Sequence, residues 1–500
     1  MPVGGRPYHP EPMLLRAPSR SPRPDGARAH PRARHRAAAA LLGLGVSVTG
    51  VACGSGEAPP EPPPIDHLVV VSIDTLRADH LGCYGNTVVQ TPHMDALAAE
   101  GVRYAAHVSS APSTLCSHTS LMTGTYPHTH GTPRNGHEVP DDNLMLAEVL
   151  SKAGFTTAAV IGAFPLRSKF NFDQGFDTYD DGETTRDGAK VNKLVRRWLS
   201  ERAGRGADDR FFLFVHYWDA HYPYDPPPPY DRMYRTDDVQ LVRTKDELIG
   251  IRESIAAGND ESARGEALRG LYMGGVTYVD THIGALMELL REFQVLDRSL
   301  VVLTSDHGEA MDEHWEPWDH GESTYDTSVG TPLVLRLPGG LSGGTVIDEV
   351  VSNVDVMPTL LELLRVPVPG VIEGRSFAAT ALGAGSGEDR GGNVAFAEGT
   401  KPHTEEIESE AWKNARKCRA VREGRWKLVY RPTDGLRELF DMEIDPAETN
   451  DVSGEHPDVV ARLMERLDGW TRSTPTRQAE QDLSAETLKI LGDLGYTEGE

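Results

Sequence analysis

The feature that most constrains the fold is an apolar run that ends abruptly in a carboxylate, between Asp66 and Asp74. A run of this kind predicts a β-strand that is buried on both faces and has a polar residue at its carboxyl end. Further runs of similar character lie at residues 156–161, 211–216, 300–304 and 332–337. Stretches typical of helices lie between them, among them residues 144–153 and 275–293.

Strands and helices that alternate over about 300 residues predict an α/β fold. We expect a largely parallel or mixed central sheet sandwiched by helices. In such sheets, ligands bind beyond the carboxyl ends of the strands. Asp74, His216 and Asp306 all fall at such ends or just beyond them, so we expect the functional site there.

The chain is long enough for one large domain and one smaller domain. We assign the large domain to residues 65–380 and a smaller C-terminal α+β subdomain to residues 394–500. The charge-rich residues 232–270 predict a helical insertion at the surface, and the Gly-rich residues 381–393 predict a connection between the domains. In the subdomain we expect a small antiparallel sheet and terminal helices, from segments at residues 419–430, 436–441 and 457–472.

Residues 1–53 have the pattern of a targeting segment. An arginine-rich stretch precedes an uncharged apolar run at residues 37–52, which is shorter than the about 20 residues of a membrane span and suits a signal peptide. A small residue before Cys53 is typical of a bacterial lipoprotein, which makes Cys53 the predicted lipid anchor. A cleaved soluble export signal and a wrongly chosen start are the alternatives. Residues 54–64 form a Pro-rich linker, and we expect an exported protein in the bacterial periplasm or at the cell surface.

The overall charge argues against nucleic-acid binding. The net charge is −25, and eight of the 50 Lys and Arg residues lie in the leader with only two of the 75 acidic residues. A nucleic-acid backbone requires a basic surface, which the rest of this chain lacks. The remaining cysteines, Cys83, Cys116 and Cys418, have neither the spacing of a zinc site nor that of a disulfide framework.

Two strand ends carry residues that suit a cation. Asp74 follows one apolar run, and Asp306 and His307 follow another. Two carboxylates and one imidazole suit a single divalent cation of borderline softness, so we favour Mn or Zn, with Ca or Mg as alternatives. A helix cap at Asp74 and an ordinary polar turn at Asp306 are the simpler interpretations.

Small hydroxyl residues at positions 111–124 precede a run that is compatible with a helix. A helix N-terminus offers free N–H groups to an anion, and a hydroxyl bound to a cation there could become a nucleophile. Thr114 is the candidate, and N-capping by Ser113 or Thr114 is the alternative. His221, in a rigid aromatic loop, could bind a tetrahedral anion or protonate a leaving group, although a structural aromatic corner also explains it. His320 follows Asp306 closely enough to reach the same rim.

Taken together and in this order, these segments resemble the sulfatase family of the alkaline phosphatase superfamily. The resemblance includes the segment at 126–131, and it extends to a C-terminal signature that contains residues 424–429 and 438–448. It implies that residues 65–380 form the catalytic domain. It also implies site roles: a single cation bound by Asp74, Asp306, His307 and Thr114; Thr114 as nucleophile; His118 in place of the family's arginine; and Asn135, His221 and His320 around the anionic oxygens of the ester.

The departures from the family pattern are informative. Sulfatases carry Cys or Ser at the nucleophile position, and this residue is converted to formylglycine; Thr114 stands there, so no formylglycine is expected. Cys116 lies two residues late, and Thr75 replaces the second acidic ligand. Formylglycine hydrate has two hydroxyls, one to attack sulfur and one to expel sulfate, whereas threonine has only one. A phosphorylated threonine can be cleared by water that attacks phosphorus.

We therefore predict a metal-dependent hydrolase that prefers phosphate esters to sulfate esters. The alternatives are a true sulfuric ester hydrolase of arylsulfatase type and a non-catalytic binding protein on the same fold. The expected partner is a small-molecule or glycan sulfate or phosphate ester, with membrane contact only through a lipid anchor at Cys53.

Overall fold

The computed structural model describes residues 64–493, except 207–208, 236–241, 243, 312, 315–317, 341–342, 384–392, 401–416 and 473–483. All described residues belong to one compact unit, Glu61–Glu500. The leader, Cys53 and nearly all of the Pro-rich linker lie outside the described residues. Among the helices that are described, none is long and apolar enough to cross a membrane.

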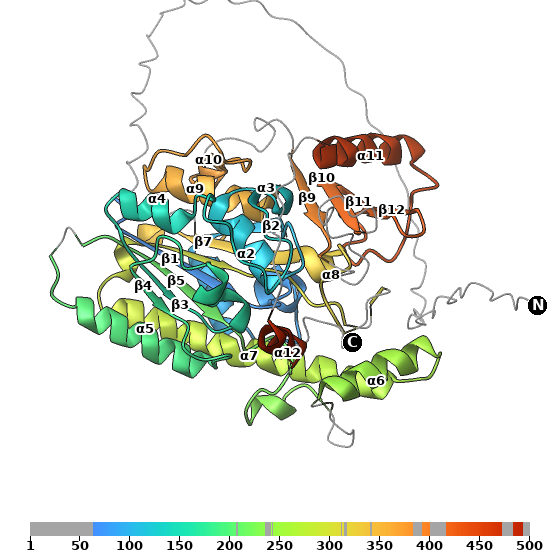
Figure 1. Ribbon diagram of the computed structural model, residues 1–500, viewed down its shortest axis with the longest axis horizontal. Coiled ribbons are helices and arrows are strands. Elements are labelled where there is room, and N and C mark those ends of the chain that lie inside the picture. Colours follow the sequence, from blue (N-terminus) through green and yellow to red (C-terminus); the bar gives the residue numbers. More distant parts are fainter. Residues whose placement is uncertain are drawn as a thin grey trace, which may run out of the picture. The chain divides into compact units, whose positions relative to one another are not determined.

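A sheet of eight strands forms the centre of the unit (Figure 1), in the order β4-β3-β5-β1-β6-β7-β2-β8. Its strands are β1 (His67–Ile73), β2 (Val102–Val108), β3 (Thr156–Val160), β4 (Thr178–Asp180), β5 (Phe211–Tyr217), β6 (Ser299–Thr304), β7 (Gly330–Arg336) and β8 (Thr345–Ser352). β1 is central and pairs in parallel with β5 and β6. β7 runs antiparallel to both of its neighbours, β6 and β2, so the sheet is mixed but mostly parallel.

Helices cover both faces of this sheet (Figure 1). The helices of this part of the chain are α1 (Pro92–Glu100), α2 (Thr114–Thr123), α3 (Pro127–His130), α4 (Leu146–Lys152), α5 (Gly188–Arg202), α6 (Lys245–Ala256), α7 (Ser262–Glu292), α8 (Asp326–Val329), α9 (Val356–Leu363) and α10 (Ala378–Ala381).

The two faces have separate apolar cores, because successive side chains of a strand point to opposite sides. Leu68 and Val70 of β1 join the cluster under α2, α4 and α9. Val69, Val71 and Ile73 join the cluster under α1, α5 and α7. The run after Asp66 is therefore continuously apolar because both of its faces are covered, as expected from the sequence.

A second, antiparallel sheet forms the C-terminal part, in the order β12-β11-β10-β9. Its strands are β9 (Val394–Glu398), β10 (Arg419–Glu423), β11 (Trp426–Arg431) and β12 (Leu436–Asp441); the helices of this part are α11 (Pro457–Arg472) and α12 (Ala485–Asp493). Ala106 of β2 and Val350 of β8 share an apolar cluster with Ala397 of β9. The small sheet therefore packs on the edge of the large one.

The α/β fold and the additional antiparallel sheet confirm the prediction from the sequence. Some boundaries were wrong. The helix expected at 275–293 begins thirteen residues earlier, at Ser262, so part of the expected insertion at 232–270 belongs to α7. The segment at 419–430 is a hairpin of two strands, β10 and β11. The strands β2, β4, β8 and β9 were not expected, and the connection at 381–393 lies largely outside the described residues.

Candidate functional site

The carboxyl ends of the three central strands meet at one edge of the large sheet. Asp74 directly follows β1, His216 lies near the end of β5, and Asp306 follows β6 after one intervening residue. The parallel register aligns Ser72 of β1 with His216 and with Thr304. The side chains of Asp74, His216 and Asp306 are almost completely buried, so the three strands bring two carboxylates and an imidazole together beneath the surface.

Ligand atoms of Asp74, Asp306 and His307 lie within 4.8 Å of one another. Both carboxylate oxygens of Asp74 are buried and have no hydrogen-bond partner in the described part of the chain. Oδ1 of Asp306 accepts the N–H groups of Thr75 and His307, at 3.2 and 2.9 Å, whereas its Oδ2 has no hydrogen-bond partner. Unpaired buried carboxylate oxygens are strongly unfavourable unless a cation compensates them.

The orientation of His307 also suits a cation. Its Nδ1–H donates to the carbonyl oxygen of Gly308 at 2.8 Å. Nε2 therefore keeps its lone pair, and it lies 3.5 Å from Asp306 Oδ2 and 3.8 Å from Asp74 Oδ1. A backbone acceptor that fixes the tautomer of an imidazole is typical of metal-binding histidines. The residues present thus fit a divalent cation at this position, which we call the cation pocket.

The electrostatics of the cation pocket agree with this assignment. Burial, together with the neighbouring charges of Asp306 and Glu309, raises the pKa of Asp74 well above its usual value. Burial lowers the pKa of His307, which keeps this imidazole neutral and able to act as a ligand. Without a cation, two carboxylates share a buried site unfavourably; a bound dication would remove that repulsion.

Helix α2 places Thr114 beside the cation pocket. Thr114 is the first residue of this ten-residue helix, is completely buried, and has its Oγ1 3.5 Å from His307 Nε2. Asn135 accepts the N–H of Leu115 through Oδ1 at 2.8 Å, and its buried Nδ2 has no hydrogen-bond partner. A nucleophile candidate, the N-terminus of a helix and an amide donor therefore converge on one position, where an anion would be stabilised.

His118 lies one turn further along α2, with Nδ1 3.7 Å from Asp306 Oδ2. Its Nδ1–H donates to the carbonyl oxygen of Thr114 at 2.7 Å, and its Nε2 accepts the hydroxyl of Ser72 at 2.9 Å. Both ring nitrogens are thus engaged within the protein. This arrangement ties the first turn of α2 to β1, and the catalytic role of His118 stays a prediction.

His221 and His320 lie beside His307. The ring of His320 is 4.4 Å from that of His307 and 5.2 Å from that of His221, between centroids. His221 stacks on Trp218, and its Nδ1–H donates to the carbonyl oxygen of Tyr222. Burial and the neighbouring His320 lower the pKa of His221 to about 3. The structure therefore brings together every described residue of the predicted site, while their chemical roles stay predictions.

Sequence analysis gave no role to two residues of this site, Glu309 and His216, although it placed His216, like Asp74, at a strand end. Glu309 accepts a hydrogen bond from His320 Nδ1–H at 3.0 Å, is almost completely buried, and orients that ring. His216 approaches Asp74 to 3.6 Å. Both belong to segments that the sequence had singled out, but only the packing shows which atoms they face.

The thiol of Cys116 is not reactive. The residue is completely buried, and burial raises the pKa of its thiol, which leaves it inert as a nucleophile. Cys83, Cys116 and Cys418 are all unbridged.

Thr75 has a positive φ of 54°, and its hydroxyl donates to the carbonyl oxygen of Asp74 at 2.8 Å.

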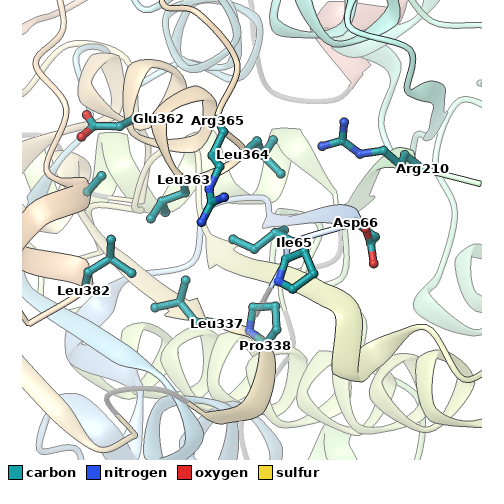
Figure 2. A pocket seen from close by; sticks show the side chains of 12 residues that line it. Ile65, Asp66, Arg210, Leu337, Pro338, Glu362, Leu363, Leu364, Arg365 and Leu382 are labelled. Carbon is teal, nitrogen blue, oxygen red and sulfur yellow. The ribbon is translucent and has the colours of Figure 1, made fainter. Parts of the chain in front are cut away.

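A cavity of about 540 Å³ lies at the opposite edge of the sheet (Figure 2). Ile65 and Asp66, which precede β1, and Arg210, which precedes β5, line it together with Arg365 and Leu382. It lies at the amino ends of these strands, whereas ligands of parallel sheets bind at the carboxyl ends. We therefore assign the functional site to the cation pocket and not to this cavity.

Comparison with known proteins identifies the family of this chain. The family model described as Sulfatase matches residues 66–366. A second model, described as N-sulphoglucosamine sulphohydrolase, C-terminal, matches residues 317–473. Together these matches extend over both sheets.

Individual relatives are distant but cover most of the chain. An arylsulfatase of Clostridium perfringens is 25% identical over 62% of this chain and 77% of its own length. An N-acetylglucosamine-6-O-sulfatase of Bacteroides thetaiotaomicron is 23% identical over 85% of this chain and 89% of its own length.

Solved structures share the fold. The phosphonate monoester hydrolase of Agrobacterium radiobacter has a TM-score of 0.65 at 22% identity, covering 81% of this chain and 95% of its own. A structure in complex with its substrate D-glucosamine-2-N,6-O-disulfate has a TM-score of 0.66 at 21% identity, covering 82% of this chain and 98% of its own. On the strength of the family match, which extends over the cation pocket, this chain belongs to the sulfatase family and is an ester hydrolase.

Proposed function

We propose that this hydrolase cleaves phosphate esters and uses Thr114 as its nucleophile. The observation that carries the proposal is the position of Thr114, buried at the N-terminus of α2 with Oγ1 3.5 Å from His307 Nε2. The buried, inert thiol of Cys116 leaves Thr114 as the nucleophile candidate at this end of the helix.

A divalent cation held by Asp74, Asp306 and His307 would supply the positive charge that favours a deprotonated Thr114 hydroxyl. We favour Mn or Zn over Ca or Mg because the donors include imidazole nitrogen. The N-terminus of α2 and the Nδ2 of Asn135 would bind the anionic oxygens of the ester.

The proposed reaction has two steps. Thr114 Oγ1 attacks phosphorus in its deprotonated form, the bond to the ester oxygen breaks, and the leaving oxygen takes a proton from His221. The negative charge of a bound ester raises the pKa of the His221 imidazole and so favours the protonated form that this step requires. Water then attacks phosphorus, the bond to Thr114 Oγ1 breaks, and inorganic phosphate leaves while His221 takes back a proton. Glu309 holds His320 in position beside the ester.

The single hydroxyl of threonine favours phosphate over sulfate. A sulfated Thr114 has no second hydroxyl that could expel sulfate, whereas a phosphorylated Thr114 is open to water at phosphorus. The fold is shared with a phosphonate monoester hydrolase, which is compatible with chemistry at phosphorus.

Sulfate ester hydrolysis is the second candidate, and the names of the relatives favour it. They include an arylsulfatase and an N-acetylglucosamine-6-O-sulfatase. With either candidate reaction, we propose a small-molecule or glycan ester as the substrate.

We also propose export to the periplasm or cell surface with Cys53 as a lipid anchor, because of the pattern of the leader. Loss of membrane association in a Cys53→Ala variant would support this anchor.

A direct test is a screen of an aryl phosphate, a bis-aryl phosphate, a phosphonate ester and an aryl sulfate, each with Mn, Zn, Mg and Ca. We expect phosphate release to exceed sulfate release. Thr114→Ala should lower kcat by at least about 10⁴-fold, as expected for loss of a nucleophile, whereas Thr114→Ser keeps a hydroxyl and should retain measurable turnover. Full activity of Thr114→Ala would refute the nucleophile, and release of sulfate without phosphate would establish the second candidate.

A further inference from the structure

His216 is a buried histidine whose ring nitrogens lack hydrogen-bond partners. It is completely buried near the end of β5, and neither Nδ1 nor Nε2 has a hydrogen-bond partner among the residues that the structure describes. An unsatisfied buried polar group costs about 1–3 kcal/mol. Such groups are rare in native proteins, and an ion is one of their explanations.

The unpaired Nε2 of His216 faces the unpaired carboxylate of Asp74. Its Nε2 lies 3.6 Å from Asp74 Oδ2, and neither oxygen of Asp74 has a hydrogen-bond partner. The register explains this proximity: His216 pairs with Ser72 of β1, and the backbone N–H of Asp74 donates to the carbonyl oxygen of Tyr217 at 2.9 Å. The neighbouring strands therefore aim a nitrogen and a carboxylate at the same point.

The separation suits two ligands of one ion better than a hydrogen bond. A charged N–H···O bond measures about 2.7–2.9 Å. Two ligands that each lie about 2.0–2.2 Å from one zinc ion are about 3.3–3.6 Å apart in a tetrahedral arrangement. Comparable separations join His307 Nε2 to Asp306 Oδ2, at 3.5 Å, and to Asp74 Oδ1, at 3.8 Å.

The neighbouring histidine does not have a free lone pair. His118 also approaches Asp306, and the ligand atoms of His118, His216 and Asp306 lie within 4.8 Å of one another. However, His118 donates through Nδ1–H to the Thr114 carbonyl oxygen and accepts the Ser72 hydroxyl at Nε2. His216 is therefore the imidazole of this group that is available to an ion.

The side chain of Thr75, next to Asp74, does not add an oxygen ligand to the cation pocket. The Thr75 hydroxyl donates to the Asp74 carbonyl oxygen at 2.8 Å, and the Thr75 N–H donates to Asp306 Oδ1. Thr75 thus orients the Asp306 carboxylate through its N–H, while its hydroxyl is turned to the backbone. From these contacts, the geometry points to His216 Nε2 as an additional ligand of the cation in the pocket, which makes a site of two carboxylates and two imidazoles that selects zinc or manganese over calcium.

The inference rests on the proposed cation site but not on Thr114 or on the choice of ester, so its test measures binding and coordination. X-ray absorption spectroscopy of the full-length protein with one equivalent of zinc counts imidazole ligands directly. We expect two in the wild-type protein and one in His216→Asn. One imidazole in the wild-type protein would overturn the inference, and this result needs no variant to fold.

Competition titration with a chromogenic zinc chelator gives the second measurement. We expect His216→Asn to bind zinc at least tenfold more weakly, with a smaller change for calcium. His67→Asn is the matched control, because His67 is a buried histidine at the other end of β1, stacked on Phe211, and its loss should leave the affinity unchanged. Equal zinc affinity in wild type and His216→Asn would refute the inference. If the ligands are found but no phosphate ester is cleaved, the proposed reaction fails and the inference stands.

Discussion

Replacing Asp74 with asparagine should change the thermal stability of this protein in opposite directions with and without a divalent cation. In the cation-free protein, the buried Asp74 carboxylate lies beside Asp306 with neither oxygen hydrogen-bonded, and burial raises its pKa. Asparagine has nearly the same shape without the charge. The cation-free variant should therefore melt at the same temperature as wild type or higher, whereas the cation should no longer stabilise it.

The size of the effect follows from mass action. A cation at 100 times its Kd stabilises the folded state by about 2.7 kcal/mol. An unfolding entropy of about 2.1 cal/mol/K per residue gives about 0.8 kcal/mol/K for a fold of roughly 400 residues. The wild-type melting temperature should thus rise by about 3 °C with saturating Mn or Zn. Removal of the buried charge should add at most about 3 kcal/mol in EDTA, which corresponds to a rise of no more than about 4 °C.

Differential scanning calorimetry in EDTA and in saturating Mn or Zn measures both effects. Asp66→Asn is the matched control: Asp66 precedes the other end of β1 and forms an ion pair with Arg298. Its replacement should leave the cation-dependent rise at about 3 °C. If the cation raised the melting temperature of Asp74→Asn as much as that of wild type, Asp74 would not be a ligand, because the cation would then bind elsewhere.

Three further predictions follow from the same region. In Gly308→Ala, the added Cβ would lie 2.2 Å from the carbonyl oxygen of Thr327. We therefore expect the free energy of unfolding, measured in urea, to fall by about 1–3 kcal/mol and the cation to bind more weakly. An unchanged free energy and an unchanged cation affinity would contradict this. Burial raises the pKa of Asp219 to about 7, so its ionised form destabilises the folded state increasingly as the pH rises from about 4 to 7. Asp219→Asn should therefore gain about 2–3 kcal/mol on wild type between pH 5 and pH 8 in urea titrations, and a pH-independent difference would refute the shift. Glu309→Gln should lower kcat about tenfold, since a neutral acceptor orients His320 less strongly, while zinc affinity stays within threefold in the chelator assay; wild-type kcat would show that Glu309 is dispensable.

The sequence predicted the elements whose chemistry is local. A continuously apolar run must be covered on both faces, so β1 and β5 were recognisable without any knowledge of their neighbours. The strands β2 and β8 were missed because charged residues such as Arg103 and Asp348 interrupt them. Those strands are stabilised by pairing along the sheet, and pairing partners far apart in the chain leave no local signal.

The same division holds within the site. The sequence by itself determined which residues stand at the strand ends and at the start of α2, because strand ends and helix starts have local signatures. Only the tertiary structure decided which atoms face the cation pocket: His118 has both nitrogens bonded within the protein, whereas the unpaired Nε2 of His216 lies beside Asp74. Those contacts join residues far apart in the chain, and the directions of side chains within the packed sheet, which no local pattern encodes, determine them.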